Sequence, residues 1–574
     1  MITKTRPDNK AKGILLPVFS LPSPYGTGCF SEEAREFIDR LSETGHTYWQ
    51  ILPLGPTGVA DSPYQPLSSF AGNAYFIDPV QLVRQGLISE EELAGFDFGN
   101  DPSKIDYDAL FACRIKMLRL AYRRFAEQRL ERAGTAGGVG IADSAGTAGE
   151  ADPYDEFVRE NAFWLEDFAL FMAVREKFGR ELSWDDWPED LRRRKKPAME
   201  RARVEFAEDV DFYRWGQFEF YRQWLELKQY ANAAGVKIIG DMPVYVSYDS
   251  SDCWADPDQF LLGEDLLPRE IAGVPPDEFA AEGQLWGNPL YDWDKMKEDG
   301  YRWWISRIRQ CFVLYDVIRL DHFRGYEAYY SCAADAKNAM NGVWHPGPGM
   351  DLFRRIPAAD AAGAAGSDGS AGDAAGCDGS AGSQDPVPLQ ERFIAEDLGH
   401  LTEGVRRLLE ESGFPGTKVL QFAFDGDPAN PYLTENYKGP CVVYTGTHDN
   451  NTTVGWFREL DQDTRAKILQ YLGYTVEEAW WFALESDAAI LRGERLLDPT
   501  EKMDQGRIPA KPLNGRIPDP AIIATELLID KAFCSSAKIA IIPLQDHLHL
   551  GSEARVNVPG TVVDNWSWRQ SGPY

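Results

Sequence analysis

Short runs of apolar residues that end in polar or acidic residues recur along the whole chain. Eight of them have the length and composition of buried strands, at residues 14–19, 48–54, 236–241, 315–321, 392–397, 417–424, 441–447 and 538–544. Most are followed by a stretch with helical spacing, such as EGVRRLLEES. Continuous apolar runs are typical of parallel strands buried on both faces. Eight strands alternating with helices predict an α/β fold, a closed (β/α)8 TIM barrel, in preference to an open sheet.

The spacing of the runs is uneven, and this predicts insertions into the barrel. Residues 80–230, between the second and third runs, are rich in Leu, Arg, Trp and Glu with helical apolar spacing. We therefore expect one barrel over 1–574 with an inserted, mainly α-helical subdomain at 80–230. The stretch beyond the last run is too short for a separate C-terminal β domain, and we expect none. Three further segments are irregular. Residues 133–152 and 357–385 are low-complexity and predicted to be mobile surface loops, and 497–520 is predicted to be a surface insertion rich in Pro and Gly.

The amino-acid composition limits the classes of molecule that this protein is expected to bind. The formal net charge of -31 disfavours nucleic acid, whose phosphates need clustered Lys and Arg. No apolar run approaches the roughly 20 residues that span a bilayer, and the N-terminus does not resemble a secretory signal. The eight cysteines are scattered, without the paired spacing of a zinc site or a disulfide framework. We expect a cytoplasmic protein that binds neither membrane nor nucleic acid.

Acidic residues stand where predicted strands end, at Asp241, Asp321, Glu396 and Asp449. Catalytic residues of a β/α barrel occupy these positions. Because alternate strand residues share a face, Arg319 and Asp321 point together into the barrel. The Arg would keep the carboxylate ionised and lower its pKa, as a nucleophile needs. For this pair alone, an ion pair without a chemical role is equally consistent.

Glu396 is a second candidate acid that could act together with Asp321. Glu396 in a partly apolar cleft would stay protonated near neutral pH and could donate its proton. A nucleophilic Asp and a proton-donating Glu about 5–5.5 Å apart perform retaining glycoside chemistry. Asp449 would be a further carboxylate, with His448 beside it as a hydrogen-bond donor. Any one of these acids could be an N-cap or turn residue, but the set together favours a glycoside-processing site.

These residues lie in recognisable motifs. The segments DMPVYV, RLDHFRG, IAEDLG and THDN resemble the four signature segments of the alpha-amylase clan. Longer segments, among them YWQILPLGPTGVADSPYQPLSSFAGNAYFIDP, GQLWGNPLYDW and ARVNVPGT, resemble glycoside hydrolase family 77, the 4-α-glucanotransferases. The resemblance runs from about residue 13 to about 569 and is broken by the low-complexity segments.

The resemblance implies a role for each matching residue. Asp321 would be the nucleophile, Glu396 the general acid/base and Asp449 the residue that stabilises the distorted sugar. Substrate would be bound or its site supported by Arg319, His448, Tyr64, Asp61, Ser62, Asp241, Trp286 and Asn557. No cofactor or metal is implied. Val59 and Ala60 depart from the family's usual aromatic and glycine, which questions an accessory sugar contact there. We interpret His547 and His549 as structural or surface residues and not as metal ligands.

The implied reaction transfers part of an α-1,4-glucan to the 4-hydroxyl of a glucan or glucose, by retaining double displacement. Maltooligosaccharides, amylose or similar glucans would be donors. The same carboxylates could instead serve an α-glucan hydrolase. A catalytically silent glucan-binding barrel is a third reading, since fold alone does not fix function.

Overall fold

The barrel is closed by eight parallel strands. The computed structural model describes residues 10–136, 152–276, 280–357, 387–399, 401–491, 496 and 518–572. Its barrel strands are β1 (Ala11–Leu15), β2 (Tyr48–Gln50), β3 (Lys237–Met242), β6 (Val317–Leu320), β9 (Phe393–Ala395), β10 (Gly416–Val419), β11 (Cys441–Tyr444) and β12 (Ile539–Pro543). They follow the order β1-β12-β11-β10-β9-β6-β3-β2, and β1 pairs with β12 to close the ring. The predicted TIM barrel is confirmed.

The two faces of each strand are buried in different surroundings, as a barrel requires. On β11, Val442 and Tyr444 belong to the main core, whereas Cys441 and Val443 pack in a second core with helices α18 to α21. On strand β3, the ring of Tyr315 packs directly against Gly240. A Cβ on Gly240 would lie 2.1 Å from the ring of Tyr315, so only glycine fits.

Some predicted strand limits were wrong by a few residues. β1 ends at Leu15, and the chain then enters a 3-10 turn at Val18–Ser20. Pro17 lacks the N–H that a continuing ladder would need. The sixth predicted strand, 417–424, ends at Val419 and continues as a 3-10 turn at Leu420–Phe422.

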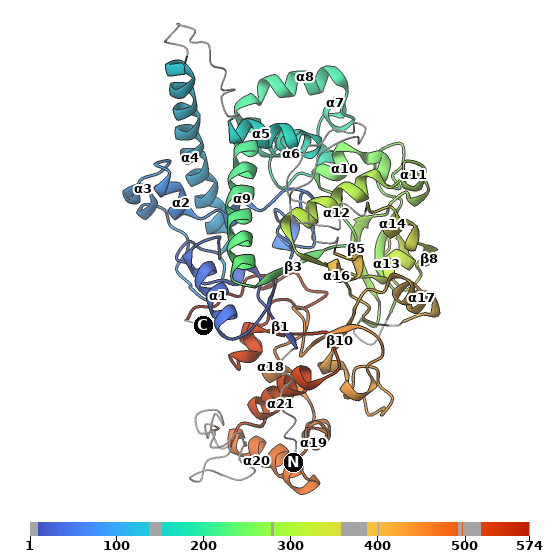
Figure 1. Ribbon diagram of the computed structural model, residues 1–574. Coiled ribbons are helices and arrows are strands. Elements are labelled where there is room, and N and C mark those ends of the chain that lie inside the picture. The colour runs from blue at the N-terminus through green and yellow to red at the C-terminus, as the bar shows by residue number, and fades with distance from the viewer. Residues whose placement is uncertain are drawn as a thin grey trace, which may run out of the picture.

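Helices fill the described part of the chain between β2 and β3, and they rise above the barrel on one side (Figure 1). They are α2 (Pro79–Arg84), α3 (Glu90–Ala94), α4 (Tyr107–Ala136), α5 (Pro153–Glu160), α6 (Ala162–Phe178), α7 (Glu189–Arg192), α8 (Lys196–Glu205) and α9 (Ala207–Ala233). α4 extends through 133–136, so the predicted loop at 133–152 begins as helix. Its remainder at 137–151 lies outside the described residues, as do 358–385 and 497–517.

A four-stranded antiparallel sheet is the main feature that the sequence reading missed. It has the order β5-β4-β7-β8 and is built from β4 (Glu270–Val274), β5 (Gln284–Pro289), β7 (Ala328–Ala333) and β8 (Val343–Pro346). β4 and β5 lie between β3 and β6, whereas β7 and β8 lie between β6 and β9. The insertions after two neighbouring barrel strands therefore share one sheet.

The remaining helices lie between barrel strands, except α22, which follows the last one. They are α1 (Glu32–Glu43), α10 (Ser251–Ala255), α11 (Trp293–Glu298), α12 (Arg302–Leu314), α13 (Arg324–Glu327), α14 (Met350–Arg354), α16 (Leu389–Arg392), α17 (Glu403–Ser412), α18 (Thr453–Glu459), α19 (Gln462–Tyr471), α20 (Val476–Leu491), α21 (Pro520–Cys534) and α22 (Leu544–His547). None of the helices in the described ranges is long and apolar enough to cross a membrane.

The segment after β12, residues 544–570, returns to the beginning of the chain. Gln570 N–H donates to the Ser20 carbonyl at 2.9 Å, and the Ser20 hydroxyl donates to the Trp568 carbonyl at 2.8 Å. Trp568 also forms an antiparallel bridge with Lys104. We call residues 544–570 the return segment. It joins the last barrel strand to residues near the first.

Candidate active site

Three neighbouring strands bring the predicted acids to one edge of the barrel. β3 pairs with β6 so that Asp241 lies beside Arg319, and β6 pairs with β9 so that Leu320 lies beside Ala395. Asp321 and Glu396 are the next residues on β6 and β9. Parallel strands end at the same edge, so these side chains meet at the mouth of the barrel.

Arg319 links two of the carboxylates. Its Nη1 donates to both oxygens of Asp241, at 2.9 and 2.8 Å, and to Asp321 Oδ1 at 2.8 Å. Arg319 and Asp241 are almost fully buried, whereas the Asp321 side chain is 25% exposed. Burial raises the pKa of Asp241 above its ordinary value, and the Arg319 charge opposes that shift. Asp321 is therefore held by a buried cation and remains open to the cleft.

Glu396 is fixed by main-chain donors. The N–H of His322 donates to Glu396 Oε2 at 2.8 Å, and the N–H of Leu398 donates to Oε1 at 2.9 Å. Burial raises the pKa of Glu396 to about 8, while the Arg319 charge acts in the opposite direction. A carboxyl group with this pKa is protonated at neutral pH and can act as a general acid.

His322 is a functional candidate that the sequence reading missed. It has a left-handed backbone with φ of 46°, which is costly for a residue other than glycine. This conformation accompanies the hydrogen bond from its N–H to Glu396. Its ring meets Trp286 edge to face at 4.9 Å, and burial lowers its pKa to about 4. His322, with a neutral ring, thus follows Asp321 in the chain, bonds Glu396 through its N–H and packs against Trp286.

Asp449 lies on the loop between β11 and α18. Asn557 Nδ2 donates to Asp449 Oδ1 at 2.6 Å, and Arg555 donates to the Asp449 carbonyl at 2.7 Å. His448 Nε2 is 3.4 Å from Asp449 Oδ2. Asn557 and Arg555 both belong to the return segment. Sequence reasoning expected Asn557 to contact substrate, and the structure places its amide on the Asp449 carboxylate.

Tyr64 contacts both Asp241 on β3 and His448 on the loop after β11. Its hydroxyl donates to Asp241 Oδ2 at 2.8 Å, and its ring stacks on His448 with centroids 5.1 Å apart. Trp566 lies 5.6 Å from the Tyr64 ring and 6.0 Å from the His448 ring. Sequence reasoning did not identify Trp566, because it follows an irregular segment without strand or helix spacing.

The other two residues of the SPYQ region have different surroundings. Ser62 Oγ accepts from the Tyr64 N–H at 3.2 Å and so shapes the turn that presents Tyr64. Asp61 has a left-handed backbone with φ of 53°. Burial raises its pKa, and the neighbouring charges that shift it belong to Arg180 and Asp108 on the side of the helical insertion. The structure thus groups Ser62 with Tyr64 and directs Asp61 toward the helices.

Trp286 on β5 forms part of the wall beside His322. Its ring lies 6.0 Å from Tyr245, and its carbonyl accepts from Gln65 Nε2 at 3.3 Å. Gln65 also donates to Asn288 Oδ1 at 3.0 Å. Gln65 thereby joins the SPYQ loop to the antiparallel sheet.

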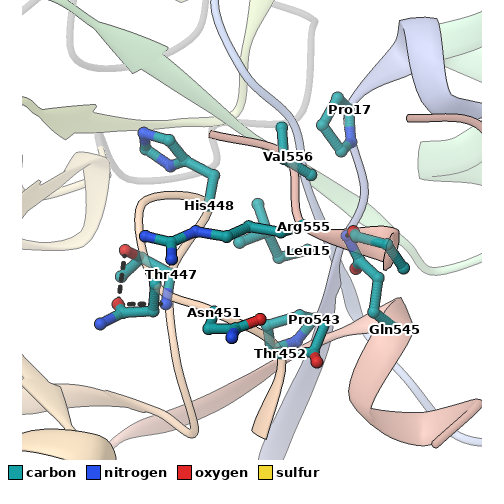
Figure 2. A pocket seen from close by; sticks show the side chains of 12 residues that line it. Leu15, Pro17, Thr447, His448, Asn451, Thr452, Pro543, Gln545, Arg555 and Val556 are labelled. Carbon is teal, nitrogen blue, oxygen red and sulfur yellow. Dashed lines mark hydrogen bonds between the residues drawn. The ribbon is translucent and has the colours of Figure 1, made fainter. Parts of the chain in front are cut away.

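A small cavity of about 20 Å³ lies behind the Asp449 loop. Figure 2 shows Thr447, His448 and Asn451 on the loop facing Arg555, Val556 and Gln545 of the return segment. Within the loop, Asn450 Oδ1 accepts from both the N–H and the hydroxyl of Thr447, each at 2.9 Å. The loop is therefore braced by its own hydrogen bonds, in addition to those that Arg555 and Asn557 make to Asp449.

The described residues contain no group of three or more His, Cys, Asp or Glu that could hold a metal ion. His549 Nε2 lies 2.7 Å from Glu526 Oε1, and the His547 ring lies 5.9 Å from the ring of His46.

Comparison with known proteins gives consistent matches over nearly the whole chain. Residues 16–573 match the profile of glycoside hydrolase family 77, described as 4-alpha-glucanotransferase. The chain is 38% identical to the 4-alpha-glucanotransferase of Clostridium butyricum, covering 96% of this chain and 94% of that protein. It is also 38% identical to that of Thermus thermophilus, with 98% and 94% covered. An amylomaltase from Streptococcus agalactiae, solved in complex with acarbose, superposes with a TM-score of 0.78 at 34% identity, covering 98% and 95%.

Proposed function

The chain belongs to the 4-alpha-glucanotransferase family, glycoside hydrolase family 77, and we propose that it transfers glucan segments through a covalent glycosyl–Asp321 intermediate. Family membership makes it a glucanotransferase. The observation that carries the mechanism is the contrast between two acids at one barrel edge. Asp321 bonds the buried Arg319 cation, whereas burial raises the pKa of Glu396 to about 8. One acid is suited to attack and the other to donate a proton.

In the first half-reaction, an Asp321 oxygen attacks the anomeric carbon of the donor sugar. The bond from that carbon to the departing glycosidic oxygen breaks, and Glu396 gives its proton to that oxygen. The products are a β-glycosyl ester on Asp321 and a shortened glucan with a free 4-hydroxyl. Arg319 and Tyr64 support this step by holding Asp321 and Asp241 in place.

In the second half-reaction, ionised Glu396 takes the proton from the 4-hydroxyl of an acceptor glucan or glucose. The acceptor oxygen attacks the anomeric carbon, releases Asp321 and restores an α-1,4 bond. Transfer must compete with water at about 55 M, which a well-positioned acceptor can do because effective concentrations far exceed that value. The carboxylates alone supply this chemistry.

The surrounding side chains suit a glucan. Asp449 and His448 would bond hydroxyls of the donor sugar, and Tyr64 would stack on that ring. Trp286 would line the acceptor side, while Asn557 would contact sugar or hold Asp449. Ser62 supports Tyr64, and Asp61 precedes it on the side of the helical insertion. We propose maltooligosaccharides, amylose and related α-1,4-glucans as donors, with glucose or glucans as acceptors, in a cytoplasmic setting.

Incubation of the purified protein with maltotriose tests this function. A ladder of longer maltooligosaccharides with glucose, and little net gain in reducing ends, is expected. Maltose and glucose alone, with rising reducing ends, would instead identify a hydrolase. Binding of maltooligosaccharides without any product would favour the catalytically silent barrel.

A further inference from the structure

Asp546, in α22 directly after β12, contacts both ends of the loop that carries His448 and Asp449. We infer that Asp546 is a positioning residue for Asp449, a buried carboxylate that fixes where the loop leaves β11 and where it enters α18. This inference rests on the proposed function of Asp449. It concerns a residue that lies behind the loop and not in the cleft.

Three short hydrogen bonds converge on this carboxylate. The Thr445 hydroxyl and the Thr453 hydroxyl each donate to Asp546 Oδ2 at 2.6 Å. The Thr453 N–H donates to Asp546 Oδ1 at 2.7 Å. Thr445 follows the last residue of β11 and Thr453 is the first residue of α18, so one side chain joins the two anchor points of the loop.

The three donors match an ionised carboxylate, which can only accept hydrogen bonds. Asp546, Thr445 and Thr453 are each fully buried. Burying a carboxylate is unfavourable unless hydrogen-bond donors replace its hydration, so loss of any of these donors would destabilise the folded protein. The arrangement therefore fixes the positions of both threonines, and with them the ends of the loop.

Gln421, in the 3-10 turn that follows the neighbouring strand β10, also bonds this loop. Its Nε2 donates to the Asn451 carbonyl at 2.9 Å, and its N–H donates to the Thr445 carbonyl at 3.2 Å. Asp449 itself lies between these two anchor points, and 45% of its side chain is exposed. A small cavity lies behind the loop (Figure 2). The hydrogen bonds at the ends of the loop therefore position Asp449 together with the direct bonds from Asn557 and Arg555.

Asp546 could instead serve the stability of the fold alone, as many buried acids do. The two roles differ in what they change. Loss of a purely structural residue lowers the amount or the melting temperature of folded enzyme but leaves the kcat of folded molecules unaltered. Loss of a positioning residue lowers kcat, because Asp449 acts most strongly on the distorted sugar, and displacement of such a group costs rate.

The experiment compares Asp546→Ala and Thr453→Val with Thr453→Ser, using maltotriose and, for slow variants, α-maltosyl fluoride. We expect Asp546→Ala and Thr453→Val to lower kcat about 10- to 100-fold with KM changed less than about threefold. Thr453→Ser retains the hydroxyl and should keep most of the rate. If Asp546→Ala does not fold, Thr453→Val and Thr453→Ser still decide the matter. Equal kcat for these two Thr453 variants would overturn the proposal.

Asp78→Ala is a matched control. Asp78 is also a buried carboxylate, and it accepts from the Val80 N–H at 3.0 Å to cap α2. It should cost stability without lowering kcat. A second test places Asp546→Ala in an Asp449→Asn background. Because Asp546 acts through Asp449, the second substitution should add little loss, whereas full additivity would contradict the inference.

Hydrogen exchange separates failure of this inference from failure of the proposed function. Asp546→Ala should speed amide exchange across residues 445–453, and Asp78→Ala should not. If amide exchange rises in Asp546→Ala but Asp449→Asn keeps the wild-type kcat, Asp546 does anchor the loop and the proposed role of Asp449 is wrong. If exchange in the loop is unchanged in Asp546→Ala, Asp546 does not anchor the loop and this inference is wrong.

Discussion

Arg319 Nη1 lies 2.8 Å from Asp321 Oδ1 and 2.8 Å from Asp241 Oδ2, so one nitrogen joins two carboxylates on neighbouring strands. Asp241 thus compensates the buried Arg319 charge, and Arg319 in turn orients Asp321. Two carboxylates at this distance would repel each other without the cation between them. The position of Asp321, the proposed nucleophile, therefore depends on Arg319 and Asp241, to which we assign no part in bond making or breaking.

Arg319→Lys should therefore be a poor replacement, although it keeps the charge. A lysine ammonium is a compact point charge on a flexible stem and cannot reproduce the planar guanidinium. We expect kcat on maltotriose to fall at least about 100-fold, with the fold retained. Steady-state kinetics with circular dichroism checks this. Near-wild-type turnover would show that charge alone is enough.

Asp321→Asn should remove the covalent step but keep the shape of the cleft. The expected loss of kcat is about 10⁴-fold or more, as for other essential nucleophiles. Calorimetric titration with maltooligosaccharides should still detect binding. Mass spectrometry of the wild-type enzyme with a slow fluoride donor should find a sugar on Asp321. A variant that keeps its rate would show that another residue is the nucleophile.

The pKa of Glu396, raised to about 8, predicts the pH dependence of the first half-reaction. Glu396 must be protonated to act as an acid, so the rate should be sustained below pH 8 and fall as pH rises through it. Glu396→Ala should lose that limb of the profile. It should slow maltooligosaccharide donors strongly and fluoride donors little, because fluoride leaves without a proton. Equal loss with both donors would contradict the acid role.

Trp286→Ala should shift the balance from transfer toward hydrolysis. The ring lies beside His322, next to the carboxylates, on the side assigned to the acceptor. Loss of the indole ring should weaken binding of the acceptor sugar by about 1–2 kcal/mol. Water, the acceptor in hydrolysis, does not stack on this ring, so hydrolysis should be affected less. The ratio of glucose release to reducing-end gain measures the shift. Trp344→Ala, on β8 of the same sheet and packed on Arg324, is the matched control.

Tyr64→Phe separates the hydroxyl of Tyr64 from its ring. The variant loses the 2.8 Å hydrogen bond to Asp241 but keeps the stack on His448. A hydrogen bond to a charged group is worth about 1.5–3 kcal/mol, so kcat/KM should fall by about 10- to 100-fold. Tyr64→Ala should lose more, since the ring goes too. Equal values for the two variants would assign no role to the ring.

The barrel and its carboxylates were accessible from sequence because each depends on a local pattern. A buried parallel strand is a short apolar run, and an acid after such a run marks the mouth of a barrel. Asp241, Asp321 and Glu396 each fit this pattern. Which strands become neighbours is not local, so the Arg319–Asp321 pair could be predicted but the bonds of Arg319 to Asp241 on the next strand could not.

The parts that sequence reasoning missed lack such a pattern. β5 has the sequence QLWGNP and β8 has VWHP, and Gly and Pro in such short segments do not suggest strands. They become a sheet through pairing with segments that lie after other barrel strands. Trp566 and Arg555 belong to the irregular return segment, whose structure comes from long-range contacts.

The return segment has a consequence for how the enzyme matures. Arg555, Asn557 and Trp566 reach the site from the segment that follows the eighth barrel strand, and Gln570 fastens this segment to Ser20. A nascent chain that has made seven barrel strands already carries Asp321, Glu396 and Asp449, yet it lacks the bonds that Arg555 and Asn557 make to Asp449. We therefore expect full activity only after the return segment has docked, and its removal by a protease should lower activity without altering any of the three carboxylates.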